Sequence, residues 1–243
     1  MKNAISALKR KANQYQELKK QRGVTLLEII IVLGIIGIIA AGVVVLAQRA
    51  FFTQDISDLA DSANTIHVST VDGFGKDGGY PAGGEAALGF ADETALKTDA
   101  SGDILATLYK MGKISNSEAR NSISGDYFVI QGVPTVADAT DLKGFVLSVN
   151  GLDMEQCRAL LGQVAGDWEY VEVTTAASGA APTLPTSLDV ETAAIPAAGT
   201  ILPLNTVGVL KSLAVSTNRD LNSADYAMAC ADSSTNAINL GSR

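Results

Sequence analysis

One carboxylate, Glu28, stands near the start of an otherwise uncharged apolar run that extends from Val24 to Ala47. As a helix, these 24 residues are about 36 Å long, which is enough to cross the hydrocarbon core of a bilayer. An ionisable side chain inside such a segment costs about 2.5 to 3.5 kcal/mol at the bilayer centre and less towards its edge. We therefore expect Glu28 to have a functional role and to pair with a cationic group.

The two cysteines, Cys157 and Cys230, are the second set of residues that could do chemistry, because together they can form one disulfide. If the part of the chain beyond the apolar run is exported, an oxidising compartment favours this bond, which closes a loop of about 74 residues. The alternative is two unrelated buried thiols. Metal binding is disfavoured because the sequence has no Cys-x-x-Cys and His67 is its one histidine.

Catalytic chemistry finds little support in the residue pattern. The sequence has one histidine, no metal-ligand spacing, no nucleophile elbow and no paired carboxylates that differ from ordinary surface acids. The glycine-rich stretch 73–89 is not a phosphate-binding loop, because Gly75 and Lys76 are followed by Asp77 where Ser or Thr is required. We expect neither enzymatic activity nor a cofactor.

Charge is divided unevenly along the chain. Residues 1–23 hold seven basic residues and one acidic residue, a charge of +6. Because the whole chain has a net charge of −8, the remainder carries −14. The positive-inside rule therefore places the N-terminus in the cytoplasm and everything after about Ala47 across the membrane. A cleaved secretory signal is disfavoured because its apolar region is about 7 to 15 residues long, and an uncleaved anchor fits better, but neither explains Glu28. The acidic body argues against nucleic acid as a partner.

The elements that must position these residues begin with one long helix. From Phe52 to Thr70 apolar residues recur at steps of four and three, with acidic and amide side chains on the opposite face. This pattern predicts a single helix over 24–72 whose second half is amphipathic. Gly34, Gly37 and Gly42 interrupt the first half, either because small residues let membrane helices pack closely or because glycine is common in such helices.

The rest of the chain is expected to form an α+β head with an antiparallel sheet. Short runs of β-branched and aromatic residues predict strands at 126–131, 144–149 and 168–173. Helices are expected at 103–111, 153–166 (carrying the first cysteine) and 205–214, with a capping box at Ser115 and Glu118. Residues 174–200 are expected to be an exposed irregular excursion, and 224–230 to return to the sheet.

The start of the apolar run resembles the processing site of type IV prepilins. Gly23 is followed by VTLLE and an unbroken apolar segment, and the long leader and non-phenylalanine first residue are similar to the type IVb branch. Similarity to pilins of the toxin-coregulated and longus kind continues in four stretches: AGVVVLAQRA at 41–50, GKISNSEARN at 112–121, LSVNGLDMEQC at 147–157 and GVLKSLA at 208–214.

This resemblance implies a processing route and a division of the chain. A prepilin peptidase would cut between Gly23 and Val24, and the new N-terminus would be methylated, so that 1–23 is a cytoplasmic leader peptide. Residues 24–47 would be the membrane-spanning and assembly half of the helix. Residues 48–243 would be the periplasmic, later extracellular head, with 48–72 continuing the helix. The implied architecture is the type IV pilin fold, in which the long helix packs against the antiparallel sheet.

The implied function is structural. The chain would be the major pilin of a type IVb pilus, an extracellular filament that it forms with copies of itself for adhesion, aggregation or colonisation. Glu28 would meet the N-terminal amine of a neighbouring subunit, although pairing with its own amine one turn away is the plainer alternative. Implied partners are the prepilin peptidase, the pilus assembly machinery, the inner membrane before assembly, and host cells or other pili.

Two other classes of protein share part of this pattern. A minor pilin or a secretion-system pseudopilin would have the same N-terminus but build only a tip or a short piston. In a monomeric, membrane-anchored binding module, Gly23 and Glu28 would stand where they do by accident. Processing of the leader and abundance on the cell surface separate these classes.

Overall fold

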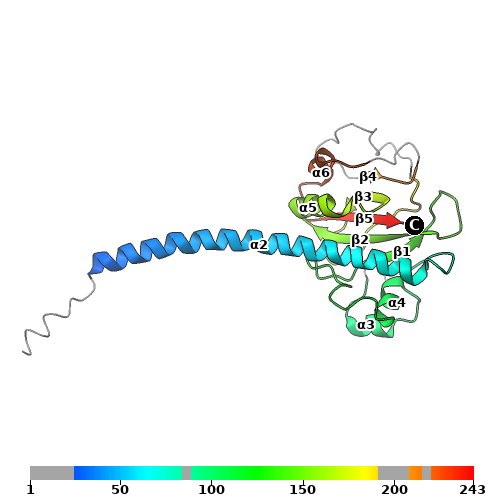
Figure 1. The fold of residues 1–243 in the computed structure, drawn as a ribbon, viewed down its shortest axis with the longest axis horizontal. Coiled ribbons are helices and arrows are strands. Elements are labelled where there is room, and N and C mark those ends of the chain that lie inside the picture. The colour runs from blue at the N-terminus through cyan, green and yellow to red at the C-terminus, as the bar shows by residue number, and fades with distance from the viewer. Residues whose placement is uncertain (1–24, 84–88, 191–207, 215–219) are drawn as a thin grey trace, which may run out of the picture. The chain divides into compact units, whose positions relative to one another are not determined.

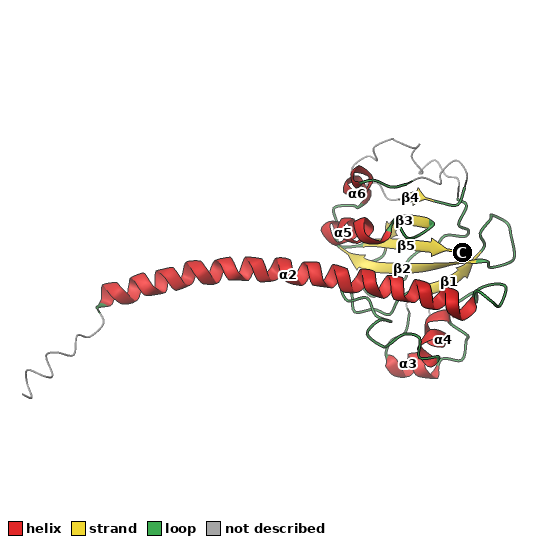
Figure 2. Cartoon of the chain, viewed as in Figure 1, coloured by secondary structure: helices red, strands yellow, loops and turns green. Residues whose placement is uncertain are grey.

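A computed structural model describes residues 25–83, 89–190, 208–214 and 220–243. The chain divides into two compact units, Met1–Phe51 and Phe52–Arg243, which are described separately. One helix, α2 (Leu26–Phe74), contributes residues to both units (Figures 1 and 2). The helix predicted over 24–72 is confirmed within the described residues, where it begins at Leu26 and ends at Phe74, and residue 24 lies outside them.

Within the second unit, α2 supplies one apolar face to the main core. The buried residues are Ile56, Leu59, Ala60, Ala63, Ile66, Thr70 and Phe74. These positions repeat at three- and four-residue steps, so they share one side of the helix. The predicted stripe is confirmed except at Phe52, which is only half-buried.

A five-stranded antiparallel sheet forms the centre of this unit. Its strands are β1 (Val129–Val133), β2 (Gly144–Leu152), β3 (Tyr170–Thr175), β4 (Gly208–Lys211) and β5 (Asn236–Ser242). Their order is β1-β2-β5-β3-β4. The three predicted strands are confirmed as β1, β2 and β3, with boundaries shifted by a few residues. The C-terminal strand β5 lies in the middle of the sheet, between β2 and β3 (Figure 1).

Four shorter helices begin at side-chain caps. They are α3 (Glu93–Thr98), α4 (Ile104–Lys110), α5 (Met154–Val164) and α6 (Ser223–Ala229), capped by Asp92, Asp103, Asp153 and Asn222. Each cap side chain accepts hydrogen bonds from backbone N–H groups that the first helical turn leaves unpaired. The helices predicted at 103–111 and 153–166 are confirmed as α4 and α5. Ser115 and Glu118 make the predicted reciprocal hydrogen bonds, but the residues that follow Ser115 form a turn and not a helix.

Two predictions for the C-terminal part are wrong. A helix was expected over 205–214, but residues 208–211 form the strand β4. The prediction failed because so short an apolar run does not show whether its period is that of a helix or of a strand. Residues 205–207 lie outside the described residues. The segment 224–230, expected to return to the sheet, forms the helix α6, whose capping box joins Asn222 and Asp225.

Both faces of the sheet are covered. On one face lies the main core, to which α2, α4 and α5 contribute. On the other lies a smaller cluster of Val133, Val146, Tyr170, Leu188 and Val209. Residues 176–190 are irregular, as predicted, but they are not uniformly exposed, since Leu188 is fully buried. The second sheet face carries apolar side chains, and this segment removes them from water. Residues 191–200 lie outside the described part.

Candidate functional site

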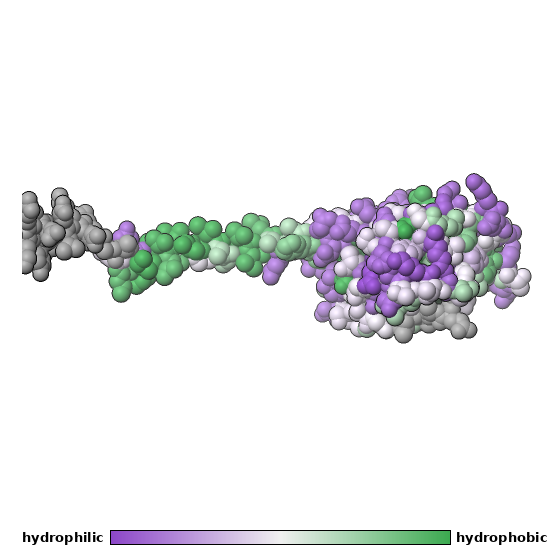
Figure 3. All heavy atoms as spheres, turned by 90° about the horizontal axis from the view of Figure 1, so that it is seen from below, coloured by the Kyte–Doolittle hydropathy of each residue, from purple (hydrophilic) through white to green (hydrophobic). Residues whose placement is uncertain are grey.

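The first part of α2 presents apolar side chains on all sides. Every residue from Thr25 to Leu46 is exposed, and Figure 3 shows this segment as an almost continuous hydrophobic surface. By length and composition, α2 can cross a membrane. Soluble monomers rarely leave a surface of this kind open to water, so lipid or other protein chains must cover it. Glu28 is the one charged residue between Leu26 and Ala47.

The helix start is organised by Thr25. The backbone N–H of Glu28 donates to Thr25 Oγ1 at 3.2 Å, and the N–H of Ile29 donates to the Thr25 carbonyl at 3.2 Å. Thr25 is therefore the N-cap, and Glu28 occupies the third helical position, where a negative charge also interacts favourably with the helix dipole. Sequence reasoning missed Thr25, although the Thr-x-x-Glu spacing is the signature of a capping box.

The Glu28 carboxylate itself is available for an external partner. Among the residues that the structure describes, none donates a hydrogen bond to it, and the side chain is exposed. The two predicted processing residues, Gly23 and Val24, lie outside the described residues. The role of these three residues in processing and assembly therefore stays a prediction.

The disulfide between Cys157 and Cys230 is present. Cys157 lies in α5, Cys230 directly follows α6, and their Cα atoms are 6.1 Å apart. Both residues are fully buried in the main core. The bond closes a segment that contains β3, β4 and the irregular residues 176–190, so it restrains a part of the head in which a long stretch of backbone is irregular.

His67 has a packing role. Its ring stacks on Trp168 with centroids 4.4 Å apart and lies 5.8 Å from the ring of Phe145. Burial lowers the pKa of His67, while the nearby carboxylates of Asp167 and Glu169 oppose this shift. The imidazole is therefore neutral at physiological pH and serves as one more aromatic surface of the core.

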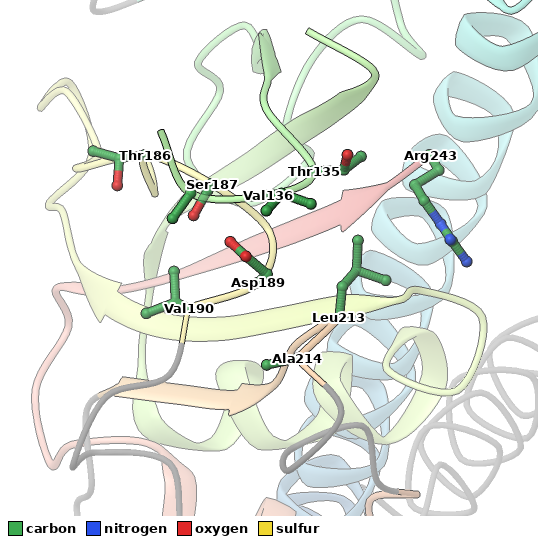
Figure 4. Close-up of a pocket in the computed structure, with 10 residues that line it drawn as sticks. Thr135, Val136, Thr186, Ser187, Asp189, Val190, Leu213, Ala214 and Arg243 are labelled. Carbon is green, nitrogen blue, oxygen red and sulfur yellow. The ribbon is translucent and has the colours of Figure 1, made fainter. Parts of the chain in front are cut away.

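A cavity of about 780 Å³ opens on the side of the sheet covered by the smaller cluster (Figure 4). Asp189 points towards its centre in the figure, and buried Ser187 lies nearby. The Arg243 guanidinium at its rim is bound to Glu169 at 2.6 Å. Among its described lining residues there is no histidine or cysteine.

Comparisons with known proteins agree with this architecture. Residues 107–238 match the family described as toxin-coregulated pilus subunit TcpA, and residues 18–44 match the prokaryotic N-terminal methylation motif. A toxin coregulated pilin of Vibrio cholerae is 38% identical over 207 residues, covering 85% of this chain and 82% of that protein. A second one, of V. cholerae serotype O1, is 34% identical over 194 residues, covering 80% and 76%.

A solved structure supports the fold. The crystal structure of TcpA, a type IV pilin from the V. cholerae El Tor biotype, matches with a TM-score of 0.57 and 22% identity. The match covers 78% of this chain and 99% of that one. The family match over the head, the methylation motif over the start of the helix and the shared fold lead to one conclusion: the chain belongs to the toxin-coregulated pilus subunit family and is a type IV pilin of the type IVb branch.

Proposed function

We propose that this pilin is made as an inner-membrane precursor, is cut by a prepilin peptidase between Gly23 and Val24, and then polymerises with copies of itself into an extracellular filament. Residues 1–23 are the leader, 24–47 anchor the precursor and later fill the filament interior, and 48–243 form the exported head. The filament serves adhesion, aggregation or colonisation, and the subunit has no enzymatic role. The pilus assembly machinery transfers the subunit from membrane to filament.

The exposed apolar surface of α2 carries this proposal. About 22 residues of helix, from Thr25 to Leu46, have no buried position. Their length of about 33 Å matches the hydrocarbon core of a bilayer. The same surface packs against the equivalent helices of other subunits once lipid is left behind, and Gly34, Gly37 and Gly42 give it places for close approach.

Glu28 supplies the specificity of docking in this proposal. Cleavage after Gly23 creates an α-amino cation at Val24, one residue before the cap Thr25. That amine lies at the positive end of its own helix dipole, where a cation is disfavoured. In an apolar filament interior it needs a carboxylate, and an unpaired buried charge costs about 3 to 5 kcal/mol. The Glu28 carboxylate of a neighbouring subunit, exposed and without a described partner, satisfies it.

Processing is tested by sequencing the N-terminus of filaments sheared from cells. A methylated chain that starts at Val24 is the expected result. Gly23→Val should leave the precursor uncut, because a bulky side chain hinders the peptidase, and filaments should be absent. Chains that still begin at Val24 in this variant would show that the assigned site is wrong.

Pairing is tested by three substitutions at Glu28. Glu28→Gln keeps the shape and the hydrogen-bonding capacity of the side chain but removes the charge. Glu28→Asp keeps the charge on a shorter side chain, and Glu28→Ala removes both the charge and the side-chain length. If charge pairing drives docking, Gln and Ala variants should be processed and held in the membrane fraction but yield no sheared filaments, and Asp should give a reduced yield. Thr25→Ala is the matched control for loss of capping. Normal filament yield from Glu28→Gln would contradict the pairing role.

A further inference from the structure

The sequence contains one Asn-Gly pair, Asn150–Gly151, near the end of β2. In such a pair the backbone nitrogen of glycine can attack the side-chain amide carbon of asparagine. The C–N bond of the side-chain amide breaks, its nitrogen leaves as ammonia, and a five-membered succinimide ring forms. Water then opens the ring to aspartate or isoaspartate. Glycine gives the fastest reaction because it has no side chain to hinder the attack.

The fold requires glycine at 151. Its φ of 71° lies in the left-handed region, and an added Cβ would approach Ser124 Cβ to 3.0 Å and the Ser178 backbone nitrogen to 3.1 Å. The pairing of β2 with β5 also changes register between Val149 and Leu152, so this position is an irregularity in the ladder. A side chain at 151 would strain both backbone and packing, so the reactive pair cannot be avoided by replacing its glycine.

The side chain of Asn150 is held on both of its polar atoms. Its amide nitrogen donates to Asp126 Oδ2 at 2.8 Å and lies 3.2 Å and 3.3 Å from the carbonyl oxygens of Ala177 and Ala180. Its amide oxygen accepts from Ser124 Oγ at 3.1 Å. The residue is only 9% exposed. Attack on the amide carbon requires this side chain to turn towards its own backbone, which would break these bonds.

The attacking atom and the carboxylate are held as well. The Gly151 N–H donates to the Ala176 carbonyl at 2.9 Å, so the nitrogen that must lose its proton is already engaged. Asp126 Oδ2 also accepts from the Gly179 N–H at 2.8 Å. The carboxylate thus joins β2 to the turn at 177–180, and neither reacting group can move unless this local structure opens.

We infer that Asn150–Gly151 is a latent deamidation site that the Asp126 carboxylate keeps closed in the folded head. The inference is independent of how the subunit assembles. Conversion would replace the amide donor by a second carboxylate that faces Asp126 and the carbonyl oxygens of Ala177 and Ala180, so these three acceptors would lose the donor that they share. Isoaspartate would also add a methylene to the backbone of β2, an inner strand of the sheet.

The test ages the purified full-length chain in detergent at mildly alkaline pH and measures aspartate plus isoaspartate at position 150 by peptide mass spectrometry. The reference is the same position in the chain unfolded in urea. Folded wild type should convert at Asn150 much more slowly than the unfolded chain, because the reaction must wait for local opening. Asp126→Ala should accelerate folded-state conversion at Asn150 about tenfold or more, because the local opening that the reaction requires becomes easier. Asp141→Ala, which removes an exposed acid bound to Lys143, is the matched control and should change nothing.

Two results would overturn the inference. One is a folded wild-type chain that converts at Asn150 as fast as the chain in urea. The other is a folded Asp126→Ala variant with the wild-type rate. If circular dichroism shows that Asp126→Ala does not fold, Ser124→Ala replaces it, since it removes the bond to the Asn150 amide oxygen and one to the Asp126 backbone. An unchanged rate in that variant would contradict the inference in the same way.

Discussion

Removing the disulfide should cost the head a large part of its stability. Cys157 and Cys230 are separated by 73 positions, and in the chain-entropy model closing a loop of this length restricts the unfolded chain by about 4 kcal/mol at 25 °C. A domain is typically stable by about 5 to 15 kcal/mol, so the double variant Cys157→Ala/Cys230→Ala should lose a substantial fraction of its free energy of unfolding. Alanine is chosen because a buried serine hydroxyl without a partner would add its own penalty.

The assay is urea unfolding of the full-length chain in detergent, followed by the fluorescence of Trp168. This is the single tryptophan, and it is buried in the main core, so its signal reports the head. The double variant and the reduced wild type should show the same lowered midpoint. A loss of less than about 1 kcal/mol would refute the entropic argument, because it would mean that the unfolded chain is already restrained. Thiol labelling of native protein without reductant should find no reactive cysteine.

Two further substitutions test the packing of the second sheet face. Burial raises the pKa of Glu172 above its usual 4.5, and the hydrogen bond from Asn239 opposes this shift. The folded head therefore loses stability as the pH rises through the folded pKa and Glu172 ionises. Below 4.5 the carboxyl is protonated in both the folded and the unfolded chain, and this loss is absent. Glu172→Gln should therefore raise Tm at neutral pH and lose that advantage in acid, whereas a constant gain would contradict the burial argument. Gly241→Ala should destabilise the head by about 1 to 3 kcal/mol in urea unfolding, because the new Cβ would lie 2.6 Å from Leu188 Cδ2. Gly166→Ala, with nothing within 4 Å, is its control and should be neutral.

The elements with a strong period or an explicit cap were predictable from the sequence. The stripe from Ile56 to Thr70 has enough repeats to identify a helix, and Asp153 with Gln156 marks the start of α5 as a capping box. The pairing of Cys157 with Cys230 was predictable because only one intramolecular bond can be drawn. The N-cap Thr25 of α2 was also predictable, because Thr25 and Glu28 have the Thr-x-x-Glu spacing that marks a helix start.

The central strand β5 could not be found in this way, because its residues are poor strand formers. It contains Asn236, Asn239 and Gly241, and asparagine and glycine are depleted in strands. Asn236 donates to the carbonyls of Leu152, Ala231 and Ser233, and Asn239 donates to Glu172 and to the Thr183 carbonyl. Leu152, Glu172 and Thr183 come from distant parts of the chain, whereas Ala231 and Ser233 lie close to Asn236 in sequence. The distant hydrogen bonds help to outweigh local propensity, and a short window of sequence does not reveal them.

The disulfide encloses a part of the head whose backbone lacks regular support. Residues 176–190 form no helix or strand, yet Leu188 must stay on the second sheet face to exclude water from Tyr170. Each ordered residue costs about 1 to 2 kcal/mol of backbone entropy, and an irregular segment recovers less of this through ladder hydrogen bonds. A covalent bond that encloses the segment lowers the entropy of the unfolded chain and so offsets part of that cost without requiring any particular sequence within the loop. The head can therefore carry a long irregular excursion on a regular sheet, and excursions of this kind are where surface recognition usually resides.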